Sequence, residues 1–125
     1  MINVLLTGGC GFLGKFICAE LLAKDSPLPL KMLRIFDTAD YKGDADPRIE
    51  FVKGDILDQE AVNKACKGID VVIHSAAIVD WGTHPPEEVF AVNTTGTANI
   101  ITACKADGVK VLVYTSSLDA IFEGK

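Results

Sequence analysis

Short apolar runs alternate along the chain with longer stretches in which apolar residues recur at helical spacing. The runs predict five strands, at residues 2–7, 31–37, 49–55, 70–77 and 110–117. Each run is almost continuously apolar instead of alternating with polar residues, a pattern typical of parallel strands covered on both faces. The strands are therefore expected in a buried parallel sheet.

Helices are predicted at residues 11–23, 58–67 and 86–107. Asp58 is a good N-cap residue for the second, and Gly68 and Gly108 close the second and third. In the first helix, apolar Leu13, Phe16, Ile17 and Leu21 recur at helical spacing.

Alternation of strands and helices with right-handed crossovers predicts one α/β domain over residues 1–125. Its expected form is a Rossmann-type doubly wound parallel sheet in the order 3-2-1-4-5, ending after strand 5. The polar segment 38–48 leaves little room for a crossover helix. This order puts the turn after strand 1 at the point where ligands bind in such sheets.

Composition narrows the possible partners and locations. A net charge of -5 without a Lys/Arg cluster argues against nucleic acid as a partner. No apolar run is long enough to cross a membrane, and the first residues lack the features of a signal peptide. Four separated cysteines then predict reduced thiols and a cytoplasmic protein. His74 and His84 lack partners at metal-ligand spacing, so no metal site is expected.

The glycine-rich segment 7–16 fits two kinds of nucleotide-binding loop. Gly9 to Lys15 spell G-x-x-x-x-G-K, but a P-loop needs Ser or Thr next, where Phe16 stands. An aromatic ring cannot hold the magnesium ion, which disfavours the ATP-binding interpretation.

The same segment matches the dinucleotide pattern through Gly8, Gly11 and Gly14, with a strand before it and a helix after it. Gly8 would permit the tight turn, Gly11 the approach of the pyrophosphate, and Gly14 close packing of helix on strand. The backbone N–H groups of Phe12 and Leu13, at the positive end of the helix, would meet the pyrophosphate. The alternative is a plain glycine turn.

Asp37 ends the second strand at the distance where a carboxylate accepts hydrogen bonds from both ribose hydroxyls. A carboxylate there repels a 2′-phosphate, and the next residues, Thr38, Ala39 and Asp40, include no arginine. The expected cofactor is therefore NAD rather than NADP.

Five segments together resemble the extended short-chain dehydrogenase/reductases, and more closely the 3β-hydroxysteroid dehydrogenase/isomerase family. They are TGGCGFLG (7–14), GDILD (54–58), HSAA (74–77), VNTTGTANIITAC (92–104) and YTSS (114–117). The resemblance covers essentially the whole chain. It implies an oxidoreductase that transfers hydride between a secondary alcohol, steroid or sterol-like, and NAD.

The resemblance also implies roles for particular residues. Asp55 and Ile56 would contact the adenine, and Ala76 and Ala77 would line the wall beside the adenosine and pyrophosphate. Ser75 stands where the family commonly has Asn, and turn chemistry alone would make Asp55 an ordinary solvated residue.

Two further assignments concern the catalytic end of the site. Ser117, with Ser116 as the near alternative, would hydrogen-bond the substrate oxygen. A hydroxyl at the end of a strand can instead hydrogen-bond the backbone of the next loop. Asn93 would steady the active-site helix, or be an ordinary polar helix residue. Asp80, Trp81 and Thr83 are a plausible rim for an apolar ligand.

The family's catalytic Tyr-x-x-x-Lys pair is missing from these 125 residues, since Ala45 and Leu118 stand four residues after Tyr41 and Tyr114. We therefore expect the N-terminal cofactor half of a longer enzyme, inactive by itself, whose parent could form homodimers through regions beyond it. The alternatives are a non-catalytic NAD(H)-binding module, or an enzyme acting on nucleotide sugars or dihydroflavonols.

Overall fold

The computed structural model describes residues 1–43, 45–75, 87 and 91–114. These residues form one parallel sheet in the order β3-β2-β1-β4-β5, as predicted. The strands are β1 (Ile2–Thr7), β2 (Leu30–Asp37), β3 (Ile49–Lys53), β4 (Val71–His74) and β5 (Val111–Tyr114). Strand order reverses between β1 and β4, so the carboxyl ends of these two strands flank the switch point.

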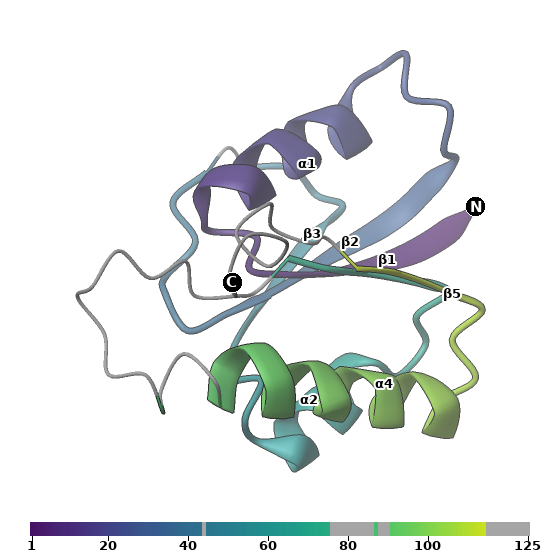
Figure 1. Cartoon of the computed structure of the whole chain (residues 1–125). Helices are drawn as coiled ribbons and strands as arrows, with labels where there is room; N and C mark the ends of the chain where they lie inside the picture. Colours follow the sequence, from purple (N-terminus) through teal and green to yellow (C-terminus); the bar gives the residue numbers. More distant parts are fainter. Residues whose placement is uncertain (44, 76–86, 88–90, 115–125) are drawn as a thin grey trace, which may run out of the picture.

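Helices cover both faces of the sheet (Figure 1). Helix α1 (Phe12–Leu22) lies on one face, and α2 (Gln59–Ala65) and α4 (Thr97–Ala106) lie on the other. Asp58 caps α2 as predicted, because its carboxylate accepts hydrogen bonds from the amides of Glu60 and Ala61. Within the described part of segment 38–48 there is no helix, also as predicted.

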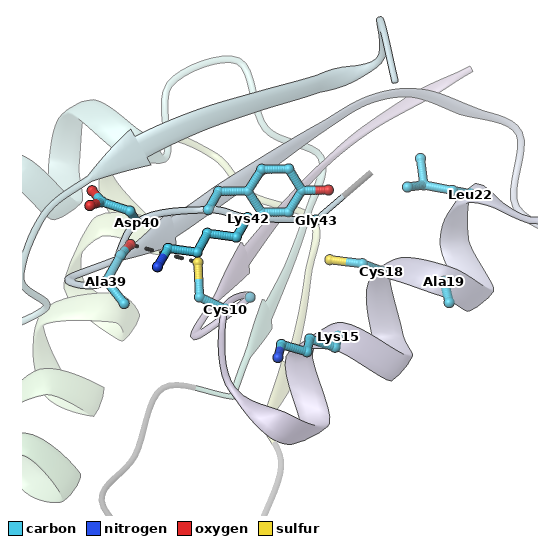
Figure 2. Close-up of a pocket in the computed structure, with 11 residues that line it drawn as sticks. Cys10, Lys15, Cys18, Ala19, Leu22, Ala39, Asp40, Lys42 and Gly43 are labelled. Atoms are coloured by element: carbon cyan, nitrogen blue, oxygen red, sulfur yellow. Dashed lines mark hydrogen bonds between the residues drawn. The ribbon is translucent and has the colours of Figure 1, made fainter. Parts of the chain in front are cut away.

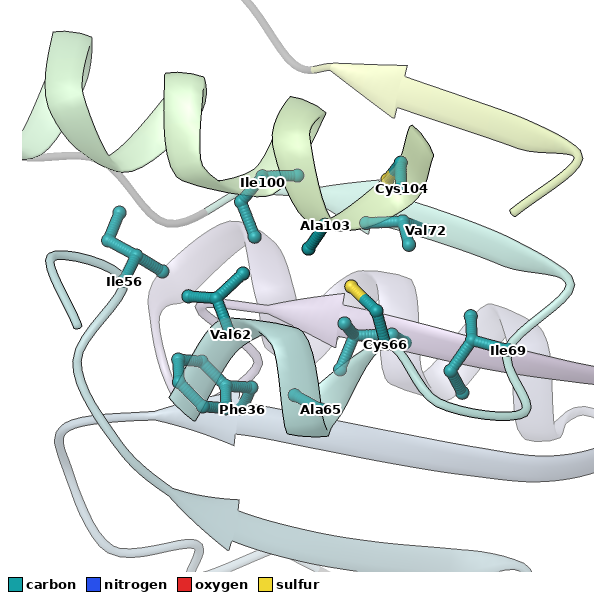
Figure 3. Close-up of a cluster of buried hydrophobic side chains, with 11 residues drawn as sticks. Phe36, Ile56, Val62, Ala65, Cys66, Ile69, Val72, Ile100, Ala103 and Cys104 are labelled. Atoms are coloured by element: carbon teal, nitrogen blue, oxygen red, sulfur yellow. The ribbon is translucent and has the colours of Figure 1, made fainter. Parts of the chain in front are cut away.

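The apolar core is divided by the sheet into two clusters. Leu5 of β1 packs toward α2 and α4, in a cluster that includes Phe36, Val62 and Ile100 (Figure 3). Its chain neighbours Val4 and Leu6 pack toward α1 in the second cluster. Successive strand residues point to opposite faces, so a continuously apolar strand can supply both clusters.

The apolar residues of α1 do not all face the core. The helix buries Gly14, Cys18 and Leu21, whereas Leu13 is 47% exposed and Phe16 is 60% exposed. Gly14 lies against the turn after β1, and this contact determines which side of the helix faces the sheet. Helical spacing of apolar residues does not contain that information.

The predicted long helix is not regular over its described part. Residues Ala91–Gly96 form a π-helix, η1, which continues directly into α4. The described parts of strands 4 and 5 end at His74 and Tyr114. Residues 76–86, 88–90 and 115–125, which include the ends of both predicted strands, lie outside the described residues.

Candidate functional site

The turn after β1 has the geometry that the glycine pattern predicts. Gly8 has a φ of 72°, a left-handed conformation that residues with a side chain rarely adopt. Its carbonyl accepts a hydrogen bond from the amide of Gly11 at 3.1 Å. At Gly14, an added Cβ would lie 2.2 Å from the carbonyl oxygen of Gly8 and 2.6 Å from the Cα of Gly9. The turn and the first turn of α1 can pack this closely because both contain glycine.

The N-terminal end of α1 offers unused backbone donors. Gly11 is its N-cap and provides no side-chain hydrogen bond to the helix, and the structure gives the amides of Phe12 and Leu13 no acceptor among the described residues. Phe12 is 83% exposed, and its ring meets that of Phe16 edge to face at 5.2 Å between centroids. An uncapped helix end with free N–H groups is suited to binding an anion.

Asp37 lies at the end of β2 and faces the same turn. One carboxylate oxygen accepts a hydrogen bond from the amide of Cys10 at 2.9 Å, and the other from the amide of Ala39 at 3.0 Å. The carboxylate thus joins the glycine turn to the loop after β2. Sequence reasoning missed the Cys10 bond, because it joins two residues 27 positions apart.

The thiol of Cys10 has a raised pKa. Partial burial is the largest cause, and the negative charge of Asp37 adds to it. The protonated thiol contacts the carbonyl oxygen of Ala39 at 3.7 Å. Cys10 is therefore part of the wall of the loop and is a poor nucleophile.

The turn after β3 places Asp55 and Ile56 differently. Asp55 is exposed and accepts a hydrogen bond from the amide of Leu57 at 2.9 Å. Ile56 is only 5% exposed, its side chain packs in the core, and its carbonyl oxygen accepts a 2.8 Å bond from the side chain of Asn99 in α4. Of these two residues, Asp55 is the one exposed to a ligand that contacts this turn.

A buried histidine links the two strands at the switch point. His74 is 1% exposed, and its Nδ1 lies 2.7 Å from the hydroxyl of Thr7. Its Nε2 lies 3.0 Å from the hydroxyl of Thr97, and its ring stacks on that of Tyr114. Burial lowers the pKa of His74 to about 4, so the ring is neutral near pH 7. Sequence reasoning considered His74 only as a metal ligand and missed these contacts.

A pocket of about 600 Å³ adjoins the glycine turn on the side of α1 (Figure 2). It shares Gly9 and Cys10 with the turn, and Lys15 of α1 and Lys42 of the loop after β2 also line it. Of the residues predicted to bind cofactor, those that the structure describes are not among the residues lining it. The pocket is therefore a neighbour of the predicted dinucleotide site and does not coincide with it.

Several residues with predicted roles lie outside the part of the chain that the structure describes. Ala76 and Ala77, the serines Ser116 and Ser117, and the possible ligand rim at Asp80, Trp81 and Thr83 lie outside the described residues. Among the described residues, no cluster of His, Cys, Asp and Glu could hold a metal ion. None of the helices described is both long and apolar enough to span a membrane.

Comparison with known proteins agrees with this geometry. Residues 5–125 match the model of the 3-beta hydroxysteroid dehydrogenase/isomerase family. The chain belongs to this family. The chain is similar to the 3 beta-hydroxysteroid dehydrogenase/Delta 5-->4-isomerase of vaccinia virus (strain Western Reserve), with 36% identity over 121 residues. That match covers 96% of this chain and 35% of the viral protein.

Two further similarities extend the comparison. The human 3 beta-hydroxysteroid dehydrogenase type 7 is 37% identical over 123 residues, covering 94% of this chain and 33% of that protein. A mutant uronate dehydrogenase from Agrobacterium tumefaciens, solved in complex with NAD, has a TM-score of 0.79 and 30% identity. That match covers 94% of this chain and 41% of the bacterial enzyme. The chain thus spans about a third of the length of these curated relatives.

Proposed function

We propose that the chain binds NAD(H) at the turn after β1 and supplies the cofactor half of an NAD-dependent oxidoreductase. In this proposal the whole protein transfers hydride between NAD and the 3β-hydroxyl carbon of a steroid or sterol-like alcohol. The observation that carries it is the Asp37 carboxylate, fixed at the end of β2 by the amides of Cys10 and Ala39. A carboxylate in this place suits a ribose diol and opposes a 2′-phosphate.

The described residues fit a dinucleotide. The space in which a Gly14 side chain would lie is filled by the turn itself, so the helix end stays close to the place of the pyrophosphate. The amides of Phe12 and Leu13 would donate to the phosphates, and Asp37 would accept from the ribose. When bound, NAD supplies the hydride acceptor.

The roles of the remaining predicted residues are proposals from family membership. Asp55 and the backbone of Ile56 would contact the adenine, and Ala76 and Ala77 would line the adenosine and pyrophosphate. Ser117, or Ser116, would hold the substrate oxygen. The general base would come from a Tyr-x-x-x-Lys pair that these 125 residues do not contain. A cytoplasmic location and a homodimer of the whole protein stay predictions.

A second candidate substrate class is a sugar or sugar acid. The similarity in fold to a uronate dehydrogenase favours it, whereas the two curated relatives are named for steroid substrates. An assay of the whole protein with NAD and either a 3β-hydroxysteroid or a hexuronate distinguishes the two. NADH formation with the steroid alone supports the first proposal, and with the hexuronate alone the second.

Titration of the chain with NADH, followed by nucleotide fluorescence, tests the cofactor proposal. Asp37→Ala should weaken NADH binding by about tenfold or more, because hydrogen bonds to a charged group contribute about 1.5–3 kcal/mol. Wild type should prefer NADH over NADPH.

Asp40→Asn is the matched control, since Asp40 is a nearby carboxylate that pairs only with exposed Lys53 at 3.1 Å. Its affinity should stay near that of wild type. Equal affinities for NADH and NADPH, or an unchanged affinity in Asp37→Ala, would contradict the proposed role of the carboxylate.

A further inference from the structure

Polar side chains from three elements meet beneath the switch point of the sheet. Thr7 ends β1, His74 ends β4 and Thr97 begins α4, and the ring of His74 bridges the two hydroxyls at 2.7 and 3.0 Å. Thr7 and His74 are almost fully buried. Removing such groups from water is unfavourable unless their hydrogen bonds are satisfied, so packing alone would favour apolar residues at these places.

The directions of the hydrogen bonds define the protonation of the ring. The hydroxyl of Thr97 donates its single proton to the carbonyl oxygen of Asn93 at 3.0 Å, and a carbonyl can only accept. In this arrangement Nε2 of His74 carries a proton and donates it to Thr97. In a neutral ring Nδ1 is then an acceptor, and it receives the proton of Thr7.

The other end of this chain of bonds agrees with that assignment. The hydroxyl oxygen of Thr7 accepts from the amide of Ser75 at 3.0 Å, and a hydroxyl that accepts in this way can donate its proton to Nδ1 of His74. The side chain of Ser75 in turn donates to the carbonyl oxygen of Thr7. The last residue of β1, which leads directly into the glycine turn, is held on several atoms by the end of β4.

Thr97 is also the point where the helix changes its geometry. The π-helix Ala91–Gly96 ends immediately before it, and its hydroxyl bond to Asn93 reaches back into that π-helix. Such i to i−4 bonds from Thr compete with the regular backbone pattern and bend helices. π-helical turns are frequently found at functional sites.

We propose that His74 is a positioning residue, which as the neutral Nε2–H tautomer holds Thr97 and so keeps the π-helical turn with Asn93 in place beside the dinucleotide site. The proposal rests on the proposed function in one respect, the presence of NAD(H) at that site. His74 itself contacts neither cofactor nor substrate in this role. It connects the end of β1, the end of β4 and the start of α4 as one unit.

The test uses the full 125-residue chain labelled with ¹⁵N, in wild type and in variants at Thr97. Long-range ¹H–¹⁵N spectra report which ring nitrogen carries the proton, and the variant His84→Gln assigns the signals, because the chain has two histidines. We expect the Nε2–H tautomer in wild type and in Thr97→Ser, which keeps the hydroxyl. Thr97→Val removes the acceptor and should change the tautomer signals and the amide resonances of Asn93 and Gly96.

NADH affinity is measured on the same samples. Thr97→Val should weaken NADH binding by about three- to tenfold, the range of one ordinary hydrogen bond. Thr97→Ser keeps the hydroxyl and should bind NADH about as tightly as wild type. Thr102→Val is the matched control, because Thr102 makes the same type of bond, to Ala98 at 2.9 Å in the same helix, but is exposed. It should change neither the tautomer nor the affinity.

An Nδ1–H tautomer in wild type, or a Thr97→Val variant that behaves like Thr102→Val, would overturn the proposal. If wild type binds no NADH but the spectra respond as expected, the link from His74 to the π-helical turn is supported and the proposed function fails. If NADH binds equally to wild type and Thr97→Val, the function stands and the positioning role is overturned.

Discussion

Gly14, in the first turn of α1, and Gly11, its N-cap, are glycine for different reasons, and this difference can be tested. A methyl group at Gly14 would meet the backbone of Gly8 and Gly9 at 2.2 and 2.6 Å, and backbone atoms cannot rotate away. Gly14→Ala should therefore lower the free energy of unfolding by about 3 kcal/mol, the upper part of the range for overpacking, and abolish NADH binding. Urea denaturation and NADH fluorescence measure the two effects.

Gly11→Ala provides the contrast. Gly11 has a φ of -82° and a ψ of -179°, which alanine adopts without strain, and an added Cβ would come no closer than 3.4 Å to Gly8. Stability should fall by less than about 1 kcal/mol, while NADH affinity should fall if, as proposed, the pyrophosphate approaches this residue. Intact NADH binding in Gly11→Ala would mean that the phosphates do not approach this residue.

At the scale of single residues, the sequence predicted features that depend only on neighbouring residues, such as the glycine turn and the ends of strands. The left-handed turn at Gly8 and the close packing at Gly14 follow from requirements of the turn, and the apolar run before Asp37 places it at the end of β2. The contact of Cys10 with Asp37, and the bridge of His74 between Thr7 and Thr97, depend on partners that only the folded sheet brings together. No periodicity or motif in the chain records them.

At the scale of elements, α4 and the turn after β3 form one packed unit. An added Cβ at Gly96 would lie 2.3 Å from Cδ1 of Ile56, and Asn99 of the same helix holds the carbonyl of Ile56. Gly96→Ala gains about 1 kcal/mol of helix propensity, but the overlap costs about 1–3 kcal/mol. We expect a net loss of stability, measured by urea denaturation.

Ile56→Val, which removes Cδ1, should recover part of that loss. In a double-mutant cycle the two substitutions should show a coupling energy above about 0.5 kcal/mol, as expected for residues in contact. Additive effects would mean that the side chain of Ile56 moves aside without loss.

The faces and local geometry of helices were harder to predict than their existence. Strand and helix positions follow from the period of the apolar residues, and Asp58 marks the start of α2 by its own chemistry. The buried face of α1 is determined by Gly14, and the π-helix before α4 coincides with a hydrogen bond made by Thr97. The contact of Gly14 is tertiary and overrides the apolar spacing of Leu13 and Phe16, whereas Thr97 bonds locally to Asn93 and, across the fold, to His74.

At the scale of the whole molecule, the sheet is covered unevenly. On the face of α1, the second core cluster includes residues of β1 and β2 with Val71 and Ile73 of β4 at its margin. Val111 and Val113 of β5 pair in register with these two and share their face, yet they are 49% and 45% exposed. Among the residues that the structure describes, β5 pairs only with β4, and an edge strand with an apolar surface promotes association.

We predict that the 125-residue chain self-associates through β5, and that replacing the two valines by threonine weakens this association. Threonine keeps the strand propensity of valine but exchanges a methyl group for a hydroxyl. At about 0.8 kcal/mol for each apolar group buried, the change across two copies should raise the dissociation constant by at least about tenfold. Sedimentation velocity over a range of concentrations measures the dissociation constant.

Ile101→Thr, at an exposed position on α4, is the control and should leave association unchanged. A wild-type chain that stays monomeric at every concentration would mean that the exposed edge of β5 is no site of association.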